Sequence, residues 1–114
     1  MIKLRNIKKS FGPLEVLHGV SLDVAKGEIV SIVGASGAGK STLLQIAGSL
    51  MLPDSGDVVV EGVSLSSLDD GALSMFRNRR IGFIFQDYHL LAEFSAQENV
   101  MMPMLIAGVG RREA

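Results

Sequence analysis

The strongest constraint on the fold is a loop at residues 34–42. Its sequence satisfies the pattern G-x-x-x-x-G-K-S/T at every fixed position, which is the Walker A pattern of phosphate-binding loops. The apolar stretch before it, residues 28–33, is typical of a short buried strand, and residues 43–47 continue as an apolar helix. Strand, loop and helix in this order are the context that the motif requires. They favour a phosphate site over a Gly-rich turn that carries Lys and Ser by coincidence.

Each residue type in this loop has a role toward phosphate. Gly34 and Gly39 at the fixed positions, and Gly37 between them, let backbone N–H groups curl inward where a Cβ would obstruct them. The start of the helix adds free amides and the positive end of its dipole. We expect Lys40 to reach the β- and γ-phosphates, Ser41 to offer its hydroxyl to Mg²⁺, and Thr42 to lie near the α-phosphate. The predicted nucleotide-binding residues of the loop are Gly34, Ser36, Gly37, Ala38, Gly39, Lys40, Ser41 and Thr42.

Length and composition indicate one small α/β domain at most. The 114 residues are 47% hydrophobic but only 5% aromatic, which favours an aliphatic core and excludes a disordered chain. A net charge of -1 lacks the basic footprint of nucleic-acid binders, so no nucleic-acid partner is expected. The sequence has no Cys and no apolar run long enough to span a membrane, and we therefore expect a cytoplasmic protein.

The segments around the loop predict an antiparallel β element. Residues 2–7 alternate between apolar and polar side chains, residues 10–13 form a turn, and residues 16–24 resume strand character. After the helix, a turn at residues 53–56 leads to a strand at 57–60 and a hairpin turn.

The rest of the chain predicts two helices around a further strand. Asp69 and Asp70 would cap a short helix that ends in the basic residues 77–80, which are best explained as a solvated helix terminus. Residues 81–85 are expected to form a buried strand, followed by a loop at 86–94. The capping box from Ser95 to Glu98 would start a helix ending near Gly108. Residues 111–114 are typical of the first turn of another helix.

Four stretches, in order, resemble the nucleotide-binding domain of ATP-binding cassette (ABC) transporters. They are residues 16–22, the loop at 34–42, residues 53–58 and the strand with glutamine at 81–86. The resemblance covers essentially the whole chain. Residues 85–103 are similar to the lipoprotein-releasing and macrolide-export branch of the family, and most closely to the lipoprotein-releasing members. The resemblance implies an incomplete α/β P-loop NTPase core combined with an antiparallel β subdomain.

The resemblance also implies further site residues, cofactors and partners. Phe11 matches the aromatic that stacks on adenine, where the family more often has Tyr, although a lone Phe beside a turn also fits a core or lid residue. Gln86 matches the residue that contacts Mg²⁺ or the attacking water and senses the membrane subunit, and an ordinary polar loop residue is the alternative. The implied cofactors are ATP and Mg²⁺, with Ser41 and Gln86 toward the metal. The implied partners are transmembrane permease subunits and a second copy of the domain, at the cytoplasmic face of the inner membrane.

The family places three more motifs after this region: a signature of the Leu-Ser-Gly-Gly-Gln type, a Walker B strand ending in Asp-Glu, and a switch His. The 114 residues end before all three, so the resemblance implies the N-terminal part of one ATPase domain. Such a part supplies only the Walker A half-site and is not expected to hydrolyse ATP alone. The alternatives are a free-standing small P-loop kinase or GTPase that uses Asp87 on Mg²⁺, and a non-catalytic nucleotide-binding fragment. A Walker B role for Asp87 is disfavoured, because Gln86 separates it from the apolar strand and no Glu follows it.

Overall fold

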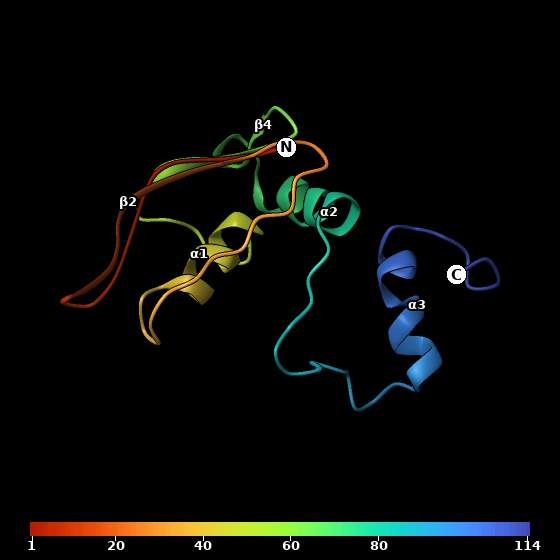
Figure 1. The fold of residues 1–114 in the computed structure, drawn as a ribbon. Helices are drawn as coiled ribbons and strands as arrows, with labels where there is room; N and C mark the ends of the chain where they lie inside the picture. Colours follow the sequence, from red (N-terminus) through yellow and green to blue (C-terminus); the bar gives the residue numbers. More distant parts are fainter. The chain divides into compact units, whose positions relative to one another are not determined.

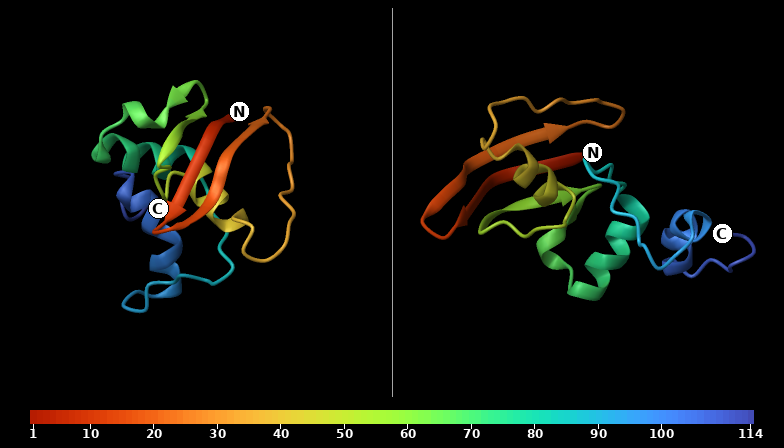
Figure 2. Two further views of the ribbon diagram at one scale, coloured as in Figure 1. Left: turned by 90° about the vertical axis from the view of Figure 1, so that its left-hand side faces the viewer. Right: turned by 90° about the horizontal axis from the view of Figure 1, so that it is seen from below.

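The chain forms two units in the computed structural model, which describes residues 1–114. The units are Met1–Leu73 and Ser74–Ala114, and Figures 1 and 2 show the path of the chain through them. None of the helices is long and apolar enough to cross a lipid bilayer.

The first unit is built on a four-stranded sheet with the strand order β2-β1-β3-β4, and all neighbours are antiparallel. The two strands predicted before the loop and the hairpin predicted at residues 61–62 are confirmed. The turn predicted at residues 10–13 is shorter, because Ser10 and Phe11 still pair with Glu15 and Leu14. The turn predicted at residues 53–56 is shorter, because Ser55 already pairs with Lys8 and begins a strand. The strands are β1 (Ile2–Phe11), β2 (Leu14–Val24), β3 (Ser55–Val60) and β4 (Val63–Ser64).

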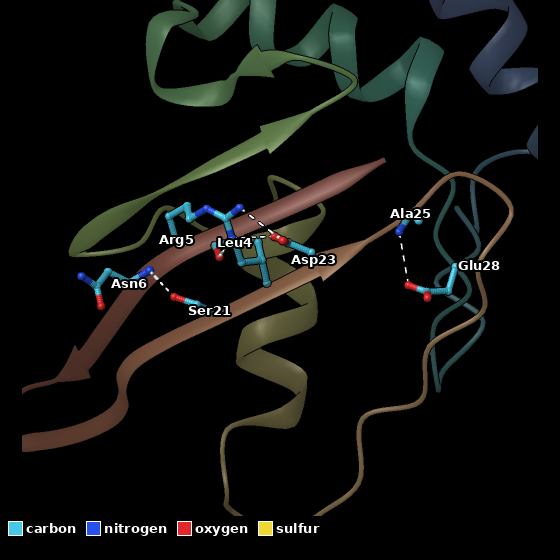
Figure 3. Close-up of polar contacts among 7 residues, drawn as sticks. All are labelled: Leu4, Arg5, Asn6, Ser21, Asp23, Ala25 and Glu28. Atoms are coloured by element: carbon cyan, nitrogen blue, oxygen red, sulfur yellow. Dashed lines mark hydrogen bonds and ion pairs between the residues drawn. The ribbon is translucent and has the colours of Figure 1, made fainter.

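A bulge interrupts β1 at Arg5 and Asn6, where its registers with both β2 and β3 shift. Asn6 has a left-handed backbone with φ 52°, a conformation that Asn tolerates better than most residues. Side chains of β2 hold the bulge in place (Figure 3). Arg5 donates to the two carboxylate oxygens of Asp23 at 2.5 and 3.3 Å, and the Asn6 N–H donates to the Ser21 hydroxyl at 3.0 Å.

The helix α1 (Lys40–Ala47) covers one face of this sheet in both sets of views (Figures 1 and 2). It confirms the apolar helix predicted after the loop, and its buried side chains are Leu43 and Ile46. Burying a side chain of this size contributes about 1.5 to 3 kcal/mol to stability. The core is aliphatic, as the composition predicts, and in this unit its most buried residues are Leu4, Ile7, Leu17, Leu43, Ile46, Val58, Val60 and Leu65 of the short 3-10 turn η1 (Leu65–Ser67).

Two segments predicted as buried strands, residues 28–33 and 81–85, have no regular structure. Most of their apolar side chains are exposed, among them Ile29 to 95%, Val33 to 87% and Ile84 to 100%. These predictions are wrong for a physical reason. A strand exists only through the ladder of hydrogen bonds to a neighbouring strand, and neither segment belongs to the sheet of this chain.

The helix α2 (Asp70–Arg80) begins in the first unit and ends in the second. The predicted cap is confirmed, since the Asp69 carboxylate accepts the N–H of Ala72 at 2.8 Å. The three arginines at positions 77, 79 and 80 lie in its last turn, where positive charge is favourable toward the helix dipole.

The second unit contains α3 (Ala96–Ile106), which confirms the predicted capping box. The Ser95 hydroxyl accepts the Glu98 N–H at 3.1 Å, and the Glu98 carboxylate accepts the Ser95 N–H at 3.0 Å. The pKa of Glu98 is lowered, first by that Ser95 N–H. A left-handed Gly108 with φ 90° follows the end of the helix, as expected of a glycine just beyond a helix C-terminus. At the end of the chain, one helical turn closes from the Ala114 N–H to the Gly110 carbonyl at 2.9 Å.

Candidate functional site

The predicted phosphate loop and the start of α1 line a pocket of about 330 Å³ in the first unit. Six of the eight predicted loop residues come together there. Gly34 and Ala38 belong to the same loop but do not line the pocket, and one unpredicted residue, from β2, does. The lining residues are Val16, Ser36, Gly37, Gly39, Lys40, Ser41 and Thr42.

The pocket lies at the amino end of α1, where backbone donors have no partner within the helix. The first intrahelical bond runs from the Leu43 N–H to the Gly39 carbonyl at 2.9 Å, so the amides of Lys40, Ser41 and Thr42 precede it. No side chain caps this end, and no acidic residue lies in the first turn. Free amides and the positive end of the helix dipole therefore both favour an anion in the pocket.

The side chain of Lys40 fixes the curvature of the loop. Its ammonium donates to the carbonyl oxygens of Gly34 at 2.5 Å and Ala35 at 2.7 Å. An ammonium has three N–H donors, so these two bonds tie the beginning of the loop to the first residue of α1 and leave a third donor. The loop thus brings a positive charge and a ring of backbone amides to the same pocket.

The three glycines of the loop are required to different degrees. Gly39 has φ 94°, and a Cβ there would lie 2.8 Å from Val16 and 3.0 Å from Leu17. Gly37 has φ 81° but open space around it. Gly34 has neither a positive φ nor a close neighbour, since the nearest atom to a Cβ would be 3.6 Å away. A Cβ at Gly39 would therefore overlap its neighbours, as expected. At Gly37 a Cβ would have space but would strain the backbone. At Gly34 a Cβ would neither overlap the protein nor strain the backbone, so the expectation of an obstruction within the loop is wrong there.

Val16 is a pocket residue that sequence reasoning missed. It lies on β2, and its Cγ1 and carbonyl oxygen are the atoms that α1 approaches at Gly39. No spacing rule connects it to the loop, because the contact depends on how α1 packs against the sheet.

Phe11, the predicted base-stacking residue, is the last residue of β1 and is 45% exposed. It belongs to the same unit as the loop but does not line the pocket. The ammonium of Lys9 lies over its ring, 5.6 Å from the centroid. The ring is therefore partly covered by a cation and still open to solvent.

Asp54, which follows α1, is a second residue that sequence reasoning missed. Its carboxylate accepts the Ser10 N–H at 2.7 Å and the Lys9 ammonium at 3.3 Å, and its own N–H donates to the Lys8 carbonyl at 2.9 Å. The pKa of Asp54 is lowered, first by the Ser10 N–H and then by Lys9. Asp54 was predicted only as part of a turn, because sequence alone does not indicate that this turn reaches the end of β1.

Gln86 lies in the second unit, exposed in a bend, with Asp87 beside it. The preceding Phe85 is stacked on Phe83 with 5.4 Å between ring centroids, and contacts the His89 ring at 4.5 Å. These contacts do not test the roles predicted for Gln86 and Asp87, which remain predictions.

The segment that follows Gln86 is fastened to α3 by one side chain. The Asn99 amide donates to the carbonyl oxygens of Leu91, Phe94 and Ser95 and accepts the Leu91 N–H, at distances of 2.8 to 3.3 Å. Sequence reasoning did not single out Asn99. A helical Asn with no partner at a regular spacing gives no signal of such a contact.

Comparisons with known proteins agree with this geometry. The model of a protein family described as "ABC transporter" matches residues 17–114. The lipoprotein-releasing system ATP-binding protein LolD of Bacteroides thetaiotaomicron is 59% identical over 114 residues, which is all of this chain and 52% of that protein. Its namesake from Porphyromonas gingivalis is 57% identical, again over all of this chain and 52% of the relative. The chain thus spans about half the length of the curated relatives it matches.

Solved structures give the same result for the fold. A dimeric structure of MJ0796, described as a bacterial ABC transporter cassette, superposes with a TM-score of 0.90 at 39% identity, over 96% of this chain and 49% of that one. A post-hydrolysis state of MJ0796 bound to ADP and Pi has a TM-score of 0.90 at 38% identity, over 99% and 52%. The likeness confirms the predicted α/β P-loop fold with its antiparallel β subdomain.

Proposed function

Because this chain belongs to the ABC transporter family, we propose that it is the N-terminal part of an ATPase domain that powers lipoprotein release. It contributes the Walker A half of a nucleotide site. The observation that carries this proposal is the pocket at the start of α1, where Lys40 and uncapped backbone amides converge. The names of the relatives, lipoprotein-releasing ATP-binding proteins, support the substrate class.

The loop would hold the phosphates of ATP through complementary charge. The amides at the start of α1 donate to phosphate oxygens, and the third N–H of Lys40 supplies a charge-assisted bond. Thr42 lies on the same pocket wall, toward the α-phosphate by family resemblance. Ser36, Gly37 and Gly39, which line the pocket, would contribute backbone donors rather than side-chain chemistry. The Ala38 N–H already donates to the Ala35 carbonyl at 3.1 Å.

The oxygen donors of the site also suit Mg²⁺, a hard cation that prefers oxygen ligands. The Ser41 hydroxyl lines the pocket, and the amide oxygen of Gln86 would be a second ligand, as the resemblance to the family implies. The ion would neutralise charge on the phosphates.

The proposed assembly follows the relatives. MJ0796 is dimeric in both structures, so a second copy of the domain is the expected partner across the nucleotide. Transmembrane permease subunits would attach the protein to the cytoplasmic face of the inner membrane, and Gln86 would respond to them.

The test of phosphate binding is calorimetric titration of the 114-residue chain with Mg-ATP. We expect Lys40→Ala to weaken binding by about 2 to 4 kcal/mol, because it removes a charge-assisted contact from a partly desolvated pocket. Lys26→Ala is the matched control, since Lys26 is an exposed lysine in the turn before the loop and does not line the pocket. Equal affinities for the wild type and Lys40→Ala would contradict the proposal.

We further expect the 114-residue chain to bind ATP without turning it over. Phosphoryl transfer depends on positioning an attacking water and stabilising charge around it. The sequence holds no Walker B Asp-Glu, signature or switch His, and each missing transition-state group costs about 10² to 10³ in rate. Steady-state phosphate release should equal that of Lys40→Ala. Robust turnover that Asp87→Asn abolishes would instead indicate a free-standing enzyme.

A further inference from the structure

A series of contacts connects the segment after α1 to the ring of Phe11. The Asp54 carboxylate accepts the Ser10 N–H at 2.7 Å and the Lys9 ammonium at 3.3 Å. The same ammonium lies over the Phe11 ring, 5.6 Å from its centroid. One carboxylate therefore fixes both the backbone immediately before Phe11 and the cation that covers its ring.

These contacts occur where β3 no longer pairs with β1, although β2 still does. The last pair between β1 and β3 joins Lys8 to Ser55, so residues 9–11 extend beyond β3. On the other side, the register between β1 and β2 shifts between Lys9 and Ser10. Asp54 thus takes the place of the missing β3 partner and adds a restraint to an end of β1 that the sheet holds only through β2.

The Lys9 side chain is unusually buried for a lysine at a hairpin end. It is only 18% exposed, and its charge faces a carboxylate and an aromatic ring at once. A cation over a ring is attracted to the electron density of the ring face. Because Phe11 is still 45% exposed, this contact orients the ring and leaves surface for another planar group.

We propose that Asp54 is a positioning residue for the nucleotide base, which holds Phe11 in its stacking orientation through Ser10 and Lys9. The inference rests on the proposed function, because it takes Phe11 as the residue that stacks on the base. The two ends of α1 then have different roles in binding the nucleotide. The amino end of α1 holds phosphate, and the segment that leaves its carboxyl end orders the aromatic that holds the base.

The test compares two ligands that differ in the base: Mg-ATP and Mg-tripolyphosphate, an inorganic chain of three phosphates. Calorimetric titrations would use the 114-residue wild type and the variants Phe11→Ala, Asp54→Ala, Asp54→Asn and Lys9→Met. Asp23→Asn is the matched control, because it removes an exposed carboxylate that pairs with a cation on the same sheet at the bulge.

We expect Phe11→Ala to weaken ATP binding about tenfold, since it removes the aromatic face on which the base would stack. Asp54→Ala should weaken it about 3- to 10-fold, and Lys9→Met about 2- to 5-fold. Asp54→Asn should resemble Lys9→Met, because its amide oxygen still accepts the Ser10 N–H. Tripolyphosphate affinity should stay unchanged in all four variants and in the control.

A double-mutant cycle separates positioning from general stability. If Asp54 acts through the ring, Asp54→Ala should have no further effect on ATP binding in the Phe11→Ala background. Equal losses for ATP and tripolyphosphate, or additive effects in the cycle, would overturn the inference. An unchanged ATP affinity in Phe11→Ala would also overturn the inference, but it would not contradict the proposed phosphate site. A wild type that binds neither ligand would refute the proposed function itself.

Discussion

The carboxylate of Asp54 couples the stability of this chain to pH. Its pKa is lowered below the usual value of 3.8 because it accepts the Ser10 N–H and pairs with Lys9. A carboxylate with a lowered pKa in the folded state binds protons more readily when the chain unfolds. Its stabilising contribution is therefore complete above the unfolded pKa and is lost as the pH falls through the folded value.

We expect the stability difference between the wild type and Asp54→Asn to be largest at neutral pH and to shrink below about pH 4. Urea unfolding followed by circular dichroism at a series of pH values measures it. Asp23 and Glu98 also have lowered pKa values, but they are common to both proteins and cancel in the difference. A difference that is constant down to pH 2.5 would show that the carboxylate charge at Asp54 does not contribute.

The residues whose place in the pocket could be predicted from the sequence are those whose spacing is local. Lys40, Ser41 and Gly39 follow from a motif that fixes residue type and position together, and all three line the pocket. Val16 and Asp54 could not be predicted, because their contacts join segments far apart in the chain, such as Ser10 and Asp54, separated by 44 positions. Only the packing of the sheet and α1 creates these contacts.

At the scale of elements, the contact between β1 and β3 depends on a missing side chain. Gly56 of β3 has φ 96°, and a Cβ there would lie 2.5 Å from the carbonyl oxygens of both Arg5 and Asn6. Backbone atoms cannot move aside as a flexible side chain can. The backbone of β1 at its bulge can therefore approach β3 this closely only because residue 56 is a glycine.

We expect Gly56→Ala to destabilise the chain by about 3 kcal/mol or more, from backbone strain and overlap together. Gly62→Ala is the control, since Gly62 has φ 79° but open space around it, and should cost about 1 to 2 kcal/mol. Chemical unfolding midpoints measure both. Similar losses in the two variants would show that overlap at the bulge is unimportant.

Elements with local signals could be predicted, and elements that need a distant partner could not. The helix α3 follows from its capping box, because Ser95 and Glu98 satisfy its first amides from within the same turn. Residues 28–33 and 81–85 have strand-like composition, but strand formation requires a neighbour that this chain does not provide. Apolar composition alone shows which segments could form a buried strand, but it does not show whether a neighbouring strand is present to pair with them.

For the molecule as a whole, these two segments predict self-association. Ile29 and Ile84 are almost fully exposed, and unpaired apolar segments readily pair with another chain. Sedimentation velocity at increasing concentration should show oligomers for the wild type and fewer for Ile29→Lys, a change that costs an exposed position little. A single monomeric boundary at high concentration, with a cooperative melt, would show that the fold closes without further partners.

The irregular stretch that leads into the phosphate loop also affects how long the polypeptide survives. Between β2 and α1 the chain has no sheet partner, and exposed segments of this kind are where proteases cut first. Lys26 and Lys40 flank it, and both are residues after which trypsin-like proteases cleave. A bound ligand lowers the population of open conformations, so the proposed nucleotide would protect this stretch from cleavage as well as fill the pocket.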